Sequence, residues 1–196
     1  RFVLDININS KIYRSIYIFL VFSGAWLIAS RELIPVVILI IFLTGSYKGI
    51  VPTRFSRTLK VCLKCLIIFI PILFLTNYLS GFILVEYSLQ NSVSTMLKEG
   101  KISHVTLLWI VLFGPLIEEI YFRELLYNYL KNYTGIFWAI LLLALYFSII
   151  HLNIIAAPSL FILGIFLGVL RFLTKTVFFS ILMHSVFNII MILLIL

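Results

Sequence analysis

Charged residues are scarce in this sequence, and acidic residues are the scarcest of them. Only 11% of the 196 residues are charged, and Asp and Glu together number 7, whereas a soluble domain carries about 25% charged residues. Asp5 is the only aspartate, which excludes a pair of catalytic aspartates. The 2 cysteines, Cys62 and Cys65, have no second pair of ligands after them, so they are interpreted as ordinary helix residues rather than a zinc or redox site.

Hydrophobic residues make up most of the chain, at 63%, with a mean hydropathy of +1.21. The apolar runs are continuous, whereas the strands of a membrane barrel alternate apolar and polar residues. The sequence therefore predicts an all-α, polytopic membrane helix bundle, folded as one integral membrane domain over residues 1–196. Seven segments are long or apolar enough to be spans: 12–30, 33–47, 61–84, 104–130, 136–154, 158–173 and 177–196. The Gly114-Pro115 pair is expected to kink the fourth of them.

Basic residues exceed acidic ones, and the net charge is +8. Because they lie in short connections between apolar runs, they indicate membrane orientation rather than a nucleic-acid partner. If the N-terminus is cytoplasmic and all seven segments cross, then Arg31, Lys98 and Lys101 are the only ones of the 15 basic residues outside. This bias predicts a cytoplasmic N-terminus and about seven transmembrane helices.

Two adjacent carboxylates, Glu118 and Glu119, interrupt the fourth apolar segment. Charge is costly at bilayer depth, so an intramembrane acid indicates a functional site. Glu119 and Arg123 are spaced to pair on one helix face, which leaves Glu118 for another task. His151, His184 and Asn188 lie in later apolar segments. With a rise of about 1.5 Å per residue, these side chains and Glu118 lie roughly 13–24 Å from the inner helix ends, so we expect them to share one cavity.

These residue types suit hydrolysis of a peptide bond. A carboxylate beside a histidine can hold and deprotonate a water, and a second histidine with an amide can stabilise the oxyanion. One glutamate and two histidines could instead bind zinc, so the residues leave open a metal-activated water. A proton relay in a transporter is a further possibility, whereas the zinc-protease motif His-Glu-x-x-His is absent from the sequence.

Three motifs in the second half of the chain resemble one known family. Residues 118–123 match a Glu-Glu-x-x-x-Arg motif, residues 147–151 match Phe-x-x-x-His, and residues 184–188 match His-x-x-x-Asn. Together, in this order, they resemble the CAAX-protease and bacteriocin-processing (CPBP, or Abi) family of intramembrane endopeptidases. The resemblance covers roughly residues 104–194. Glu124 departs from it, because many members carry glycine after the arginine.

The resemblance implies a glutamate-type or metal-dependent membrane protease with six site residues. Glu118 would be the general base, His151 would help to position the water, and His184 and Asn188 would stabilise the oxyanion. Glu119 and Arg123 would hold the helix geometry, with Glu119 able to assist catalysis. No cofactor is required by this reading, although a divalent metal such as zinc would be compatible with it.

The expected partners are the lipid bilayer and a peptide or protein substrate in the membrane, and the expected location is a bacterial plasma membrane. Relatives of this type act in bacteriocin or signal-peptide maturation or in self-immunity. The alternative is a non-catalytic immunity or scaffold protein that binds a bacteriocin or another membrane partner.

Overall fold

The computed structural model describes residues 55–83, 99 and 102–195, and all of them belong to one compact unit, Gly49–Leu196. Every regular element among these residues is a helix, which confirms the all-α prediction for this part of the chain. Five of the seven expected apolar segments are observed as helices. The segments 12–30 and 33–47, and with them the expected orientation of the N-terminus, lie outside the described residues.

Helix α3 (Phe55–Ile83) begins six residues before the expected segment and contains Pro71. Its window Phe55–Ser80 has a mean hydropathy of 2.3, and much of its surface consists of exposed aliphatic side chains. It packs mainly against α9 (Ala157–Thr174), where the rings of Phe69 and Phe166 stack with centroids 3.9 Å apart. Ser159 Oγ also donates to Asn77 Oδ1 at 2.5 Å. The α3 helix thus has one side packed against the protein, and the rest of its surface is apolar and exposed.

A single long helix, His104–Thr134, carries the two acids. It is made of α5 (His104–Leu108), α6 (Gly114–Glu119) and α7 (Tyr127–Thr134), joined by two wider π-helical segments, η3 (Trp109–Phe113) and η4 (Ile120–Leu126). Ser103 caps its start by accepting a hydrogen bond from the Thr106 amide. Gly114-Pro115 was expected to kink this helix. The structure instead places the proline at the start of α6, directly after the first π segment.

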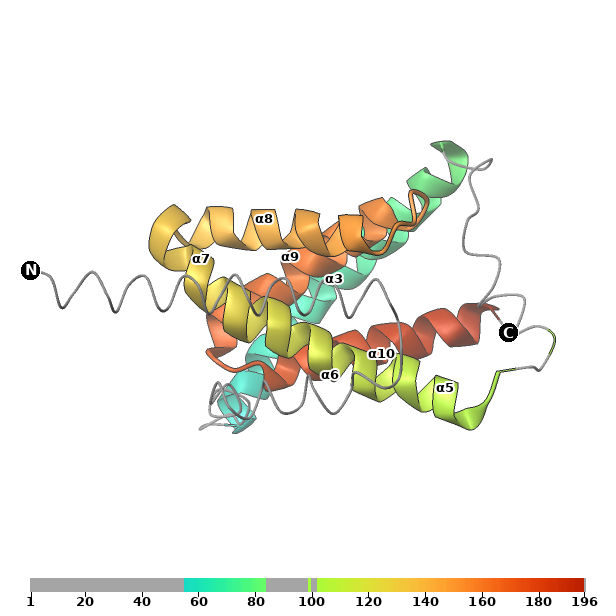
Figure 1. Ribbon diagram of the computed structural model, residues 1–196, viewed down its shortest axis with the longest axis horizontal. Coiled ribbons are helices and arrows are strands. Elements are labelled where there is room, and N and C mark those ends of the chain that lie inside the picture. The colour runs from blue at the N-terminus through green and yellow to red at the C-terminus, as the bar shows by residue number, and fades with distance from the viewer. Residues whose placement is uncertain (1–54, 84–98, 100–101, 196) are drawn as a thin grey trace, which may run out of the picture. The chain divides into compact units, whose positions relative to one another are not determined.

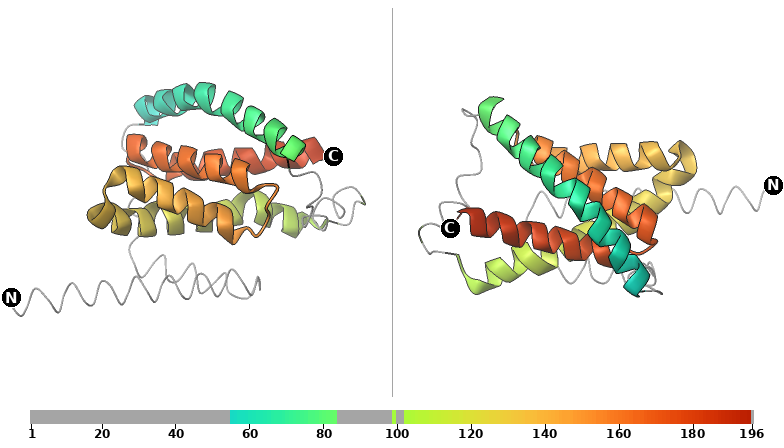
Figure 2. Two further views of the ribbon diagram at one scale, coloured as in Figure 1. Left: turned by 90° about the horizontal axis from the view of Figure 1, so that it is seen from above. Right: turned by 180° about the vertical axis from the view of Figure 1, so that it is seen from behind.

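Three further helices follow, α8 (Ile136–Ile150), α9 and α10 (Phe178–Ile195). Gly135, with φ of 81°, makes the turn into α8, a conformation that favours glycine. Gly164 allows α9 to approach α8 closely, because a Cβ there would lie 2.8 Å from Ala144 Cα. Seen from above, α9 and α10 lie between α3 and a layer formed by α8 and the long helix, as Figure 1 and Figure 2 show.

Three helices of the described residues have the length and hydropathy to cross a membrane: Phe55–Ser80, His104–Thr134 and Ala157–Thr174. Helix α8 and the stretch Phe178–Leu193 of α10 are apolar but shorter. The α10 helix packs against η3 and α6, and this contact brings the third motif to the two acids.

Candidate active site

Glu118 and Glu119 are the last two residues of α6, at the point where the long helix widens into η4. They are 5% and 0% exposed, and the following residues Ile120, Tyr121 and Phe122 are 2% exposed or less. Buried carboxylates need partners, because an unpaired charge in an apolar interior is costly. The contacts of these two acids therefore define what the site can do.

Glu119 is held from two sides. Its Oε2 lies 3.1 Å from Arg123 Nε, which confirms the predicted pairing of these residues on one helix face. Its Oε1 lies 3.0 Å from His184 Nδ1 on α10. The guanidinium of Arg123 also donates from Nη2 to the Gly164 carbonyl at 3.2 Å and lies 4.8 Å from the centroid of the Phe147 ring. The pair of Glu119 and Arg123 therefore links the acidic helix to α8, α9 and α10.

Glu118 faces His184. Its Oε2 lies 3.8 Å from His184 Nε2, and this buried oxygen has no hydrogen-bond partner among the described residues. A separation of 3.8 Å is too long for a direct hydrogen bond but suits a bridging water. Glu118 is thus the acid of the pair that is not engaged by a positive side chain at short range.

His184 is the imidazole that joins the two acids. It is 3% exposed, and each ring nitrogen faces a different carboxylate, Nδ1 towards Glu119 and Nε2 towards Glu118. Glu119 is paired with Arg123 and so acts as an acceptor, which assigns the hydrogen on Nδ1 to the bond between His184 and Glu119. In the neutral imidazole of this tautomer, the Nε2 that faces Glu118 carries the lone pair.

His151 ends α8 and reaches the same cluster through Phe147. Its Nδ1 lies 2.7 Å from the Phe147 carbonyl, so this nitrogen carries the hydrogen and donates it. The Phe147 ring contacts both imidazoles, with centroids 4.7 Å from His151 and 5.6 Å from His184. Phe147, the first residue of the Phe-x-x-x-His motif, therefore contacts both histidines and the Arg123 guanidinium.

Asn188 lies one turn after His184 on α10 and binds the main chain of another helix. Its Nδ2 donates to the Ile110 carbonyl of η3 at 2.8 Å. Four of the six predicted site residues, Glu118, Glu119, Arg123 and His184, thus form one connected network. His151 contacts the Phe147 ring beside this network, and Asn188 contacts the main chain of η3.

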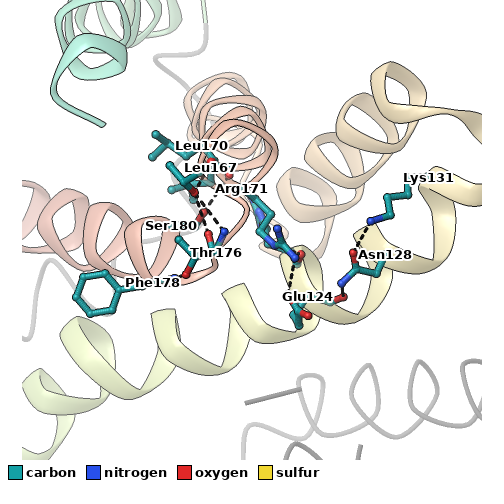
Figure 3. Close-up of polar contacts among 11 residues, drawn as sticks. Glu124, Asn128, Lys131, Leu167, Leu170, Arg171, Thr176, Phe178 and Ser180 are labelled. Atoms are coloured by element: carbon teal, nitrogen blue, oxygen red, sulfur yellow. Dashed lines mark hydrogen bonds and ion pairs between the residues drawn. The ribbon is translucent and has the colours of Figure 1, made fainter. Parts of the chain in front are cut away.

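Glu124, the departure from the family pattern, has a partner that the sequence did not reveal. Its Oε2 lies 2.8 Å from Arg171 Nη2 on α9, and Arg171 Nε donates to the Arg123 carbonyl at 3.2 Å. Figure 3 shows this contact beside the bond from Lys131 to Asn128. The charge of Glu124 is therefore part of a helix-to-helix contact at the Arg171 end of α9, and the separation of 47 positions between the partners explains why local spacing gave no signal.

The side chains of the site do not form a complete set of zinc ligands. No group of three or more His, Cys, Asp or Glu side chains placed to hold a metal is found among residues 55–83, 99 and 102–195. Glu118 and His184 provide two donors, whereas Glu119 is engaged by Arg123 and His184. A structural or catalytic zinc site needs at least three protein ligands. The peptide hydrolysis proposed for this site therefore uses protein side chains and water.

The sequence of this part of the chain matches a known protein family. Residues 101–190 match the model of the family described as type II CAAX prenyl endopeptidase, Rce1-like. This segment belongs to the CAAX protease family. The match confirms the resemblance drawn from the three motifs, and all six predicted site residues lie within the matched range. The matched segment includes the long acidic helix, α8, α9 and most of α10. It therefore contains all the helices that carry the site residues.

The same segment gave no match among curated proteins or among solved structures. The family is one of membrane proteases, which supports a protease with a peptide or protein substrate.

Proposed function

We propose that this protein is an intramembrane endopeptidase in which Glu118 and His184 activate a water molecule for attack on a peptide bond. The observation that carries the proposal is the orphaned Oε2 of Glu118, 3.8 Å from His184 Nε2 in a buried position. An ionised Glu118 and a neutral His184 present two acceptors to each other. One water that donates a hydrogen to each of them satisfies both groups and keeps an oxygen lone pair for the substrate.

The chemistry follows from this placement. Glu118 accepts a proton from the water as the water oxygen bonds to the scissile carbonyl carbon, and the carbonyl oxygen becomes an oxyanion. The tetrahedral intermediate then breaks its carbon–nitrogen bond, and the proton passes from Glu118 to the departing amine. The products are a carboxylic acid and an amine, so one water is consumed for each bond cleaved.

The other residues of the network fix the tautomer and the orientation of the side chains that hold the water. Glu119 keeps the Nδ1 hydrogen of His184 in place, and Arg123 pairs with Glu119 within an apolar interior. His151 donates from Nδ1 to the Phe147 carbonyl, which fixes its ring beside the Phe147 side chain. The proposed role of His151, as the family resemblance implies, is to help position the water. The proposed substrate is a membrane-associated peptide or protein. Its cleavage would serve bacteriocin or signal-peptide maturation or self-immunity.

A test uses purified full-length protein in liposomes with a library of quenched fluorescent peptides, both prenylated and unmodified. Glu118→Gln keeps the size of the side chain but removes the base, and we expect a loss of roughly 10²–10⁴-fold in kcat. Glu124→Gln is the matched control, because it makes the same change on the same helix at a carboxylate that pairs with Arg171. Equal activity of Glu118→Gln and the wild type would reject Glu118 as the base.

A further inference from the structure

We propose that Asn188 is a positioning residue, which holds the widened turn in front of Glu118 by binding the backbone carbonyl of Ile110. The inference rests on the proposed function, because it concerns the geometry of the same carboxylate. Asn188 Nδ2 donates to the Ile110 oxygen at 2.8 Å across the interface between α10 and η3. The bond joins residues separated by 78 positions, so it belongs to the tertiary structure and not to either helix alone.

The Ile110 carbonyl needs this donor because its own helix provides none. In an α-helix the amide of Gly114 would bind it, but that amide donates to the Trp109 carbonyl in the wider π pattern. The next amide in the π pattern would come from residue 115, and Pro115 has no N–H. Both helical donors are therefore lost, and a part-buried carbonyl without a partner lowers stability.

The position of Glu118 depends on where this turn widens. Each residue advances an α-helix by about 100°, so loss of the bulge would turn Glu118 by about that angle relative to the helix before it, and away from His184. Asn188 and His184 lie on the same helix, α10, one turn apart. Helix α10 thus carries both the amide that holds the bulge of the acidic helix and the imidazole that Glu118 faces.

The experiment is a double-mutant cycle between Asn188→Ala and Pro115→Ala. Pro115→Ala supplies an amide at the position that can bind the Ile110 carbonyl in the π pattern. With Pro115 present, Asn188→Ala is expected to lower the unfolding midpoint by roughly 2–4 °C and kcat by roughly 10²-fold, the scale of a catalytic group misplaced by about 1 Å. In the Pro115→Ala background both losses should shrink markedly.

Asn128→Ala is the matched control. Asn128 also donates from Nδ2 to a backbone carbonyl, that of Glu124 at 2.6 Å, but within its own helix. Its effects on midpoint and kcat should be equal in the presence and absence of Pro115, because no shared carbonyl connects the two positions.

The possible outcomes separate the roles. Recovery of both kcat and midpoint in the double variant supports positioning. A kcat loss of equal size in both backgrounds indicates direct contact with the oxyanion, and a midpoint loss that is not accompanied by a kcat loss indicates a purely structural bond; either result overturns the inference. If even the wild type cleaves no peptide, the proposed function fails, and equal midpoint losses in the two backgrounds would independently reject Asn188 as the donor that holds the bulge.

Discussion

The pair of Glu119 and Arg123 makes a quantitative prediction about stability. Arg123 is 2% exposed and Glu119 is 0% exposed, and the guanidinium contacts Glu119, the Gly164 carbonyl and the rings of Phe122 and Phe147. Arg123→Gln removes the positive charge but keeps a polar side chain. Glu119 is then left buried, with only His184 as a polar partner on the opposite side.

Breaking a buried ion pair on one side costs about 3–5 kcal/mol, because an uncompensated charge stays behind. The lost bond to the Gly164 carbonyl lies within this range, since contributions from residues in one network do not add. Replacing both partners removes the uncompensated charge. The double variant Glu119→Gln with Arg123→Gln should therefore recover most of the loss, to within about 1–2 kcal/mol of the wild type.

The assay is reversible unfolding of the purified protein in mixed micelles by titration with a denaturing detergent, followed by tryptophan fluorescence. Arg123→Lys, which keeps the charge but loses the planar fork, should fall between Arg123→Gln and the wild type. The reasoning is refuted if Arg123→Gln costs less than about 1 kcal/mol, or if the double variant is no more stable than the single one.

Two further predictions concern helix packing. Gly164→Ala places a Cβ 2.8 Å from Ala144 Cα, so α8 and α9 must separate; we expect a loss of about 1–3 kcal/mol in unfolding free energy, and an unchanged unfolding curve would contradict the close approach. Glu124→Gln weakens the 2.8 Å contact with Arg171 and should cost about 1–3 kcal/mol, with kcat of the folded protein retained. Loss of kcat without loss of stability in this variant would instead place Glu124 in the catalytic machinery.

The sequence predicted the helices of the second half well, because their apolar runs are long and end at clear signals. The expected segment 104–130 is observed as His104–Thr134, and 158–173 as Ala157–Thr174. The pairing of Glu119 with Arg123 was predictable too, since helical spacing alone places the two side chains on one face.

Contacts between distant segments were not predictable from local spacing. Nothing in the sequence indicated that His184 would bind Glu119 through Nδ1 while its Nε2 faces Glu118. The π segment before Pro115 was likewise hidden, because a widened turn is stabilised by a donor from another helix, here Asn188. The expectation of a kink at Gly114-Pro115 recognised the lost hydrogen bond but not the donor that replaces it.

The central claim is that Glu118 activates a water rather than attacking the peptide itself. The source of the oxygen in the new carboxyl group of the product tests this claim. A single turnover in ¹⁸O-labelled water, with enzyme in excess, separates these routes by mass spectrometry of the product and of the peptide containing Glu118. The account predicts ¹⁸O in the product carboxylate in the first turnover and none in Glu118. Unlabelled product, together with ¹⁸O in the Glu118 side chain, would show a covalent acyl intermediate and contradict the account.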